Sequence, residues 1–431
     1  MPIVRVLSAL SLFAAVTMTG CGREPATDAG GTRGAADAAG PRAGPGLGPL
    51  VPLAVGAAPG SAEPHLAANA GEVVLSWIEP DGDGHALKYS RLRGGAWDAP
   101  VVAARGEKWV VSPDDPPAVV PVRAGLWVAH WRVEAAEPYA YDIATAVSPD
   151  GGVTWSAPRL LNDDGTLTEH GFVSVFPWGE DAGAVWLDGR DLASENDNQD
   201  VGLERLASLA TSLRVARLGA DGALLEQSVV DERVCDCCTT GAAAGSAGLL
   251  LVYRDRSPEE IRDIAVTRRM ADGWSDPIVL GPDGWEIEGC PVNGPAIDAD
   301  GGAAAVAWFT AAGNRPLVRA AFSADGGATF GAAIDVDAAG AIGHVDIAML
   351  RADAAAVAWW RRATNGAELG VREVSSAGEL GPVRVLTTST ESRPNSVPQL
   401  VRSHDRLLLA WTEPGEPGRV STGYVALGGE R

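Results

Sequence analysis

The sequence predicts an all-β fold in which similar four-stranded units repeat within one domain. Three observations lead to this prediction. A short apolar strand with an aromatic residue at its end recurs along the chain, and Gly, Asp and Pro separate strands of about four to eight residues. Beyond the first 21 residues, no stretch has the apolar spacing of a long amphipathic helix.

The recurring aromatic residue gives the repeat its period. Its copies are Trp77, Trp131, Trp186, Tyr253, Trp308, Trp359 and Trp411. Successive copies lie 51 to 55 residues apart, except for a step of 67 residues from Trp186 to Tyr253. Units of about 50 residues with four short antiparallel strands are typical of β-propeller blades. We therefore predict a single propeller of seven blades, with six as the alternative.

The two ends of the repeat array predict how the ring closes. The last unit lacks a fourth strand after Tyr424–Leu427, and the segment Leu50–Val55 precedes the first unit without a partner. We expect this N-terminal segment to become the outer strand of the last blade, because closure removes an open sheet edge. The long step places a polar insertion at Asp188–Asp200, on one face of the ring.

The first residues have the pattern of an export signal. Arg5 precedes the uncharged run Val6–Met18, which is too short to span a bilayer as a helix. The following Thr19-Gly20-Cys21 resembles the end of a bacterial lipobox, which implies a lipid on Cys21. Gly22 rather than Asp follows the Cys, so the resemblance favours the outer membrane or cell surface. An ordinary secretory signal is the alternative.

Composition divides the chain further. Residues 22–47 are mainly Gly, Ala, Pro, Thr and Asp, too poor in large apolar side chains to form a core. We predict a signal peptide at 1–21, a tether at 22–47 and a propeller at 48–431. The net charge of −22 argues against nucleic acid as a partner. The membrane is expected as a partner through the lipid only, and carbohydrate, small molecules and proteins stay open as ligands.

Two turns share the motif S-x-D-x-G-x-T-aromatic. Their residues are Ser148, Asp150, Gly152, Thr154 and Trp155 in one, and Ser323, Asp325, Gly327, Thr329 and Phe330 in the other. The Asp accepts backbone N–H bonds within its turn, the Gly permits a positive φ, and the aromatic packs between sheets. These residues are therefore predicted to be structural. With the blade period, the motif resembles the Asp-box, or BNR-repeat, proteins, whose best-known members are sialidases.

The resemblance implies a sialidase-like propeller and, as one function, a glycoside hydrolase acting on acidic sugars. Sialidases clamp a carboxylate with three arginines and use a Tyr–Glu pair and an Asp. The expected first arginine region, Pro49–Leu53, has no Arg, and the last unit has no Tyr in its first strand. The weak catalytic candidates are Asp188, Arg190, Arg254, Asp255, Arg256 and Arg262. Such Arg–Asp alternation is more typical of structural ion pairs.

The other four cysteines form two motifs at equivalent places. Cys235, Cys237 and Cys238 open the fourth unit, and Cys290 opens the fifth. Both motifs precede a first strand, and first strands line a propeller channel, so we expect the sulfurs to converge at one mouth. One interpretation is disulfides in an oxidising compartment. The other is a copper or zinc site, because thiolates with imidazoles suit Cu(I) and Zn.

Other units carry polar residues at the same blade position. They are His65, Asp114, Asp115, His170, His344, Asp346 and Asn395. Three function hypotheses follow from this arrangement. The first is a binding or scaffold module with its site at the channel mouth. The second is the sialidase-like hydrolase, and the third is a copper or zinc site; the fold itself requires no cofactor.

Overall fold

The computed structural model describes residues 46–193, 209–391 and 396–427. These residues belong to one compact unit that spans 41–431. The predicted lipidation site Cys21, the insertion from residue 194 onward and Asn395 lie outside the described residues. Among the described residues, no helix has the length and apolar character needed to cross a bilayer.

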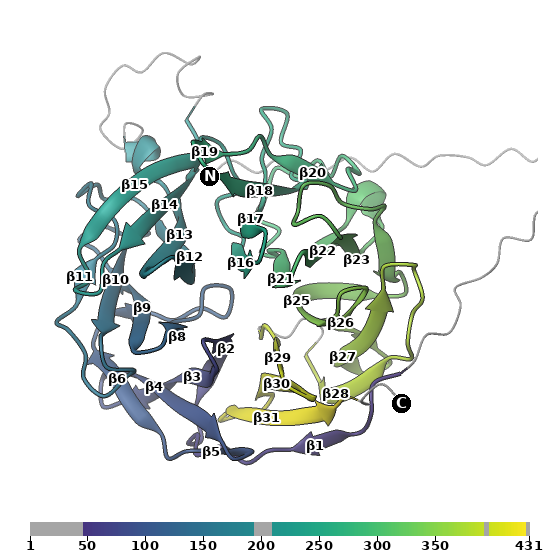
Figure 1. The fold of residues 1–431 in the computed structure, drawn as a ribbon, viewed down its shortest axis with the longest axis horizontal. Helices are drawn as coiled ribbons and strands as arrows, with labels where there is room; N and C mark the ends of the chain where they lie inside the picture. Colours follow the sequence, from purple (N-terminus) through teal and green to yellow (C-terminus); the bar gives the residue numbers. More distant parts are fainter. Residues whose placement is uncertain (1–45, 194–208, 392–395, 428–431) are drawn as a thin grey trace, which may run out of the picture. The chain divides into compact units, whose positions relative to one another are not determined.

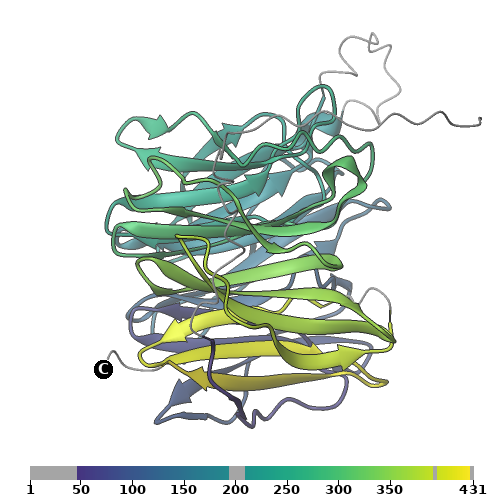
Figure 2. The same cartoon turned by 90° about the vertical axis from the view of Figure 1, so that its right-hand side faces the viewer.

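Seven antiparallel sheets form a ring, which confirms the predicted all-β propeller with seven blades (Figure 1). The turned view shows the sheets as successive layers (Figure 2). Two short 3-10 helices, η1 (Arg190–Leu192) and η2 (Ala312–Asn314), interrupt the strands of the described residues.

The first four blades follow in chain order, each from its inner to its outer strands. Blade 1 holds β2 (Ala62–Asn69), β3 (Glu72–Asp81), β4 (Gly84–Arg93), β5 (Ala96–Trp97) and β6 (Val101–Gly106). Blade 2 holds β7 (Trp109–Val110), β8 (Ala118–Arg123), β9 (Leu126–Glu134), β10 (Tyr141–Ser148) and β11 (Arg159–Leu160). Blade 3 holds β12 (His170–Trp178), β13 (Asp181–Asp188), β14 (Ser212–Leu218) and β15 (Leu224–Asp231). Blade 4 holds β16 (Gly241–Gly245), β17 (Gly248–Arg254), β18 (Ile264–Met270), β19 (Gly273–Trp274) and β20 (Ile278–Leu280).

The last three blades complete the ring. Blade 5 holds β21 (Ala296–Asp300), β22 (Ala303–Thr310), β23 (Leu317–Ser323) and β24 (Ile334–Asp337). Blade 6 holds β25 (Ala341–Arg351), β26 (Ala354–Ala363), β27 (Gly366–Ser375) and β28 (Arg384–Ser389). Blade 7 holds β29 (Gln399–Ser403), β30 (Arg406–Glu413), β31 (Arg419–Ala426) and the N-terminal β1 (Leu50–Pro52).

The ring closes as predicted. Strand β1 pairs antiparallel with β31, with Leu50 opposite Val425 and Pro52 opposite Gly423. In Figure 1 this strand lies outside the last blade, where it covers the edge of β31. The two ends of the described chain are therefore joined by backbone hydrogen bonds, which removes the exposed edge that an open ring would present.

The recurring aromatic lies on the second strand of every blade and is buried between adjacent sheets. In five blades its polar atom binds a carboxylate at 2.7–2.8 Å, and the pairs are Trp77–Glu79, Trp186–Asp188, Tyr253–Asp231, Trp359–Asp337 and Trp411–Glu413. A large ring fills the space between two sheets, and its N–H or O–H still needs a partner there. This double requirement explains why the sequence repeat is so regular.

Both Asp-box turns form the local network that their motif predicts. Asp150 accepts bonds from the Thr154 hydroxyl at 2.6 Å and the Thr154 N–H at 2.8 Å, and Asp325 is bonded by Thr329 in the same way. The turns join the third and fourth strands of blades 2 and 5. Bonds from Thr154 and Ser148 lower the pKa of Asp150 to about 2. The Asp is thus satisfied within its own turn, and the turn is joined to the adjacent blade by the bond from the Tyr89 hydroxyl to the Gly152 carbonyl.

Candidate functional site

The inner strands of all seven blades line a central cavity of about 570 Å³. One residue from each of these strands illustrates the ring: His65, Val120, Phe172, Gly241, Ala296, Val345 and Gln399. The cavity also reaches Thr239 and Pro295, which follow the two cysteine motifs in the chain. The cysteine segments therefore lie at one mouth of the channel.

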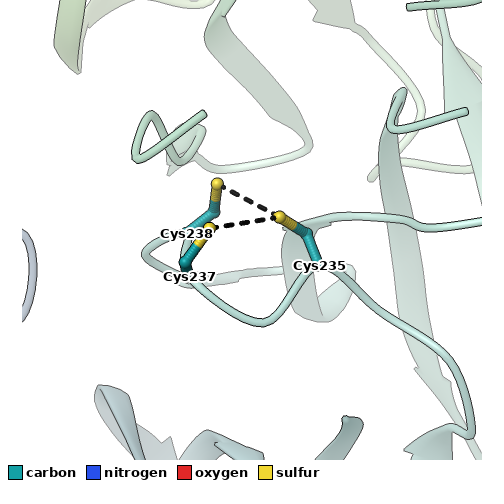
Figure 3. A group of neighbouring side chains, drawn as sticks. All are labelled: Cys235, Cys237 and Cys238. Carbon is teal, nitrogen blue, oxygen red and sulfur yellow. Dashed lines mark hydrogen bonds between the residues drawn. The ribbon is translucent and has the colours of Figure 1, made fainter. Parts of the chain in front are cut away.

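Three cysteine sulfurs face one another just before β16 (Figure 3). The Cys235 sulfur lies 3.5 Å from that of Cys238 and 3.8 Å from that of Cys237. Cys235 and Cys238 are buried, and Cys237 is half-buried. A disulfide requires about 2.05 Å between sulfurs, so no disulfide joins these residues in the structure. The disulfide interpretation is not realised here, and the thiols are free.

Cys290 from the fifth blade joins the same group. The ligand atoms of Asp236, Cys237 and Cys290 all lie within 4.8 Å of one another. Cys290 is exposed, and its thiol points to the Asp236 carboxylate at 3.9 Å. The structure thus brings all four predicted cysteines together at the junction of blades 4 and 5, and Cys237 belongs to both sets.

Two arginines surround the thiols. Arg262 donates from one nitrogen to the Cys235 sulfur and to Asp236, each at 3.3 Å. Arg254 is buried and donates to the carbonyl oxygens of Asn293, Arg262 and Phe309 at 2.7–2.8 Å. Its guanidinium also lies 4.9 Å from the centre of the Trp285 ring, a cation–π contact. Arg254 therefore ties the Cys290 segment to the blade that carries the other thiols.

The thiols differ in their acidity. Hydrogen bonds from the Cys237 and Cys238 thiols, with the charge of Arg254, lower the pKa of Cys235. Burial raises the pKa of Cys238 to about 12, and the hydrogen bond with Cys235 raises the pKa of Cys237. Metal binding would require each of these thiols to lose its proton.

The arginines proposed for a hydrolase already have partners. Arg256 forms an ion pair with Glu260 at 2.8 Å, and Arg262 forms another with the same carboxylate at 2.8 Å. Arg254 is fully occupied by backbone carbonyls. Burial raises the pKa of Asp255 to about 6. An open clamp for a substrate carboxylate needs several unpaired arginines facing one pocket, and these three do not form it.

Asp188 and Arg190 belong to a different group, around His170. Arg190 donates two bonds of 2.8 Å to Asp188, and Asp188 also accepts the Trp186 N–H. His170 is fully buried, with its Nε2 atom 3.2 Å from Asp164. The three ligand atoms of Asp164, His170 and Asp188 are close enough for a metal ion. However, Arg190 lies 2.8 Å from Asp188 and 3.4 Å from Asp164, and Arg214 lies 3.8 Å from Asp188, so this group is best described as an ion-pair network.

A third group spans the channel mouth. The Nδ1 atom of His344 in blade 6 lies 3.3 Å from Asp114, which precedes the inner strand of blade 2. The His344 backbone is left-handed, with φ of 53°, and its N–H donates to Asn293 at 2.7 Å. Burial lowers the pKa of the neighbouring cavity residue His65 to about 4, so this imidazole is neutral at pH 7.

Asp346, also predicted at the mouth, has a structural role in the ring. Its two oxygens accept the N–H groups of Ile347 at 2.8 Å and of Leu400 in blade 7 at 2.6 Å. Asp298 links blades 5 and 6 in the same way through Met349, at 2.7 Å. Burial raises the pKa of Asp346 to about 7 and that of Asp298 to about 6. These carboxyls join the inner strands of neighbouring blades.

Comparison with known proteins supports the fold. No protein-family model matches the chain, and no curated protein matches it by sequence. Among solved structures, polysaccharide lyase Uly1 has a TM-score of 0.51 at 9% identity, covering 92% of this chain and 94% of that one. A PL25 ulvan lyase bound to -[GlcA(1-4)Rha3S]- has a TM-score of 0.50 at 12% identity, covering 90% and 95%.

Sialidases are also among the similar structures. The Trypanosoma rangeli sialidase has a TM-score of 0.44 at 12% identity, over 85% of this chain. The chain spans 60% of that sialidase and 63% of the sialidase Hz136, so it matches only part of their length. At these identities the likeness concerns the fold alone. The chain has a propeller fold similar to that of the two polysaccharide lyases.

Proposed function

We propose that this propeller is a binding module whose channel mouth holds a soft metal ion, Cu(I) or Zn(II), on Cys235, Cys237 and Cys238. The observation that carries the proposal is the spacing of the sulfurs. Two thiolates bound to one ion at about 2.3 Å, at trigonal or tetrahedral angles, lie roughly 3.8–4.0 Å apart. The Cys235–Cys237 distance of 3.8 Å lies in this range, and the Cys235–Cys238 distance of 3.5 Å is shorter, so these two thiols would separate slightly around an ion.

The chemistry of the surroundings supports a metal rather than an organic ligand. Thiolates are soft donors that prefer Cu(I) and Zn(II) over Mg(II) or Ca(II). Metal binding requires each thiol to lose its proton, and the Arg262 and Arg254 charges offset part of the resulting negative charge. Two of the three sulfurs are buried, so a bound ion is shielded from competing water.

Native and denatured mass spectrometry test this proposal on the full chain carrying Cys21→Ser, purified without chelator. We expect a full-thiol denatured mass and a native mass that includes metal. Cys238→Ser should abolish that adduct, while the neighbouring Thr239→Ser, which changes no sulfur, should keep it. A denatured mass about four hydrogens below the reduced value, without a native adduct, would overturn the metal proposal in favour of two disulfides.

A second candidate function rests on the channel cavity. Its volume of about 570 Å³ lies within the range of roughly 300–1,000 Å³ that is usual for small-molecule sites. Four aspartates and one arginine line it, namely Asp115, Asp298, Asp300, Asp346 and Arg402. Asp115 pairs with Arg132 at 2.8 Å and Asp300 pairs with Arg402 at 3.0 Å, so the described lining offers no unpaired arginine to an acidic sugar, which favours a neutral saccharide. Calorimetric titration with neutral and uronate-containing oligosaccharides tests this: tighter binding of the uronate would contradict the electrostatic argument.

We also propose that the chain is exported and attached to a bacterial membrane through Cys21. The support is the Thr19-Gly20-Cys21 sequence after an apolar run. Expression in a bacterial host with a labelled fatty acid should give a lipid-labelled protein. Cys21→Ser should abolish the label, and a label that persists in this variant would refute the attachment site.

A further inference from the structure

Cys237 belongs to two donor sets at once. The first set contains Cys235, Cys237 and Cys238, and the second contains Asp236, Cys237 and Cys290. Within each set, all ligand atoms lie within 4.8 Å of one another. One sulfur therefore lies between two groups of donors, each of which supplies two further ligands of its own.

We propose that the channel mouth binds two metal ions, bridged by the Cys237 thiolate. This inference rests on the proposed metal-binding function and extends it. A thiolate sulfur has several lone pairs, so it can bind two soft ions simultaneously. The inner ion is held by Cys235, Cys237 and Cys238, and the outer ion by Cys237, Cys290 and Asp236.

The two positions differ in their exposure and their ligands. The inner set is all sulfur, with two of its three residues buried. The outer set mixes two sulfurs with a carboxylate, Cys290 is exposed, and the Asp236 side chain is 36% exposed. Three protein ligands on the exposed side leave a fourth position open to water or an incoming ligand. The outer ion should therefore exchange readily, and the inner ion should be retained.

Arg262 connects the two sets electrostatically. One of its nitrogens contacts Cys235 of the inner set and Asp236 of the outer set, both at 3.3 Å. Arg256 lies 3.8 Å from the other side of the Asp236 carboxylate. Four thiolates and one carboxylate carry more negative charge than two Zn(II) or two Cu(I) ions can neutralise. The two guanidinium groups offset part of the remaining negative charge.

The test counts ions in the full chain carrying Cys21→Ser, loaded separately with Zn(II) and with Cu(I). We expect two ions per chain, one after Cys290→Ser, and one after mild chelation of the unaltered site. Thr239→Ser is the matched control and should keep two. If the unaltered site binds only one ion, and Cys290→Ser still binds it, the bridged pair is refuted. The proposed binding of one ion by Cys235, Cys237 and Cys238 would then still stand. Absence of any ion in both loadings would refute the proposed function itself.

A spectroscopic measurement keeps the proposal testable if a cysteine variant misfolds. Loading the same protein with ¹¹³Cd(II) should give two cadmium resonances that share a scalar coupling, because only a bridging sulfur connects the two nuclei through bonds. Two uncoupled resonances, or one resonance at saturating cadmium, would refute the bridge. Circular dichroism of each variant establishes that the propeller is folded before its ions are counted.

Discussion

The two Asp-boxes on the rim differ from the cysteine group at the channel mouth in where the partners of their polar side chains come from. In an Asp-box, Asp150 binds Ser148 and Thr154, so each partner lies within a few residues of it. At the mouth, the donors come from segments more than 50 residues apart, as with Asp236 and Cys290. The Asp-box carboxylate is satisfied within its own turn, whereas the thiols face one another without a covalent bond.

This difference separates structural from functional polar residues. In the Asp-box, the Asp carboxylate is satisfied by its own turn, while the glycine carbonyls and N–H groups bond to neighbouring segments, as the Gly152 carbonyl does with Tyr89, so the polar atoms of the turn are used within the protein. A group of thiols that converges from two blades, held by a buried arginine, would have to lose its protons to bind a metal ion. Substitutions at the two regions should therefore differ in size and in their dependence on metal and pH.

The largest effect on stability is expected from Arg254→Ala. The variant leaves three buried carbonyl oxygens without their donor and removes the contact with Trp285. We expect a loss of about 3–5 kcal/mol in the free energy of unfolding, measured by urea titration with chelator present. Arg256→Ala, which removes a partly exposed ion pair, should cost less than about 1 kcal/mol. Equal losses in the two variants would contradict the structural role of Arg254.

A smaller, pH-dependent effect is expected from Asp346. Its pKa is raised from 3.8 to about 7 in the folded chain, so its contribution to stability is complete below pH 3.8 and is lost as the pH rises through 7. We expect about 2–3 kcal/mol of destabilisation between pH 5 and pH 8 from this group. Urea titrations across this range should show a shallower pH dependence in Asp346→Asn. An unchanged slope would show that the carboxyl ionises freely in the fold.

The Asp-box should show the opposite pH dependence. The pKa of Asp150 is lowered from 3.8 to about 2, so its contribution is present above pH 3.8 and disappears as the pH falls through 2. Asp150→Ala should lower the melting temperature by roughly 2 °C at pH 7 and by less at pH 2. Asp83→Ala, at an exposed aspartate in the β3–β4 turn, should have little effect at either pH. Metal binding should be unchanged in both variants.

The fold was predictable because its signals are local or periodic. A buried ring between two sheets restricts the second strand of each blade to a large aromatic, so Trp77 through Trp411 mark the blades directly. The convergence of Cys237 and Cys290 followed from the same register, since equivalent positions in neighbouring blades lie near each other. Blade counting alone was therefore enough to locate the mouth.

The remaining contacts of the site depend on loops, whose paths the repeat does not determine. Asp114 reaches His344 across the mouth only because the segment before β8 enters the channel and His344 has a left-handed backbone. Asp164 lies in the loop before β12 and carries no motif, so its contact with His170 was missed. Asn293, which positions His344, stands within the Cys290 motif, but nothing in its sequence identifies that partner.

The smallest effect should come from the one blade that replaces the repeated Trp. Tyr253 donates its hydroxyl to Asp231 at 2.7 Å, as Trp359 donates its N–H to Asp337. Tyr253→Phe keeps the ring between the sheets but removes one hydrogen bond to a carboxylate, so we expect a loss of about 1 kcal/mol, or roughly 1 °C in melting temperature. Calorimetry on the metal-free chain measures it. A loss as large as that of Arg254→Ala would mean that the Tyr253 hydroxyl contributes more to stability at this position than the packed ring does. Blade 4 would then differ from the other blades, in which the buried aromatic ring determines this position.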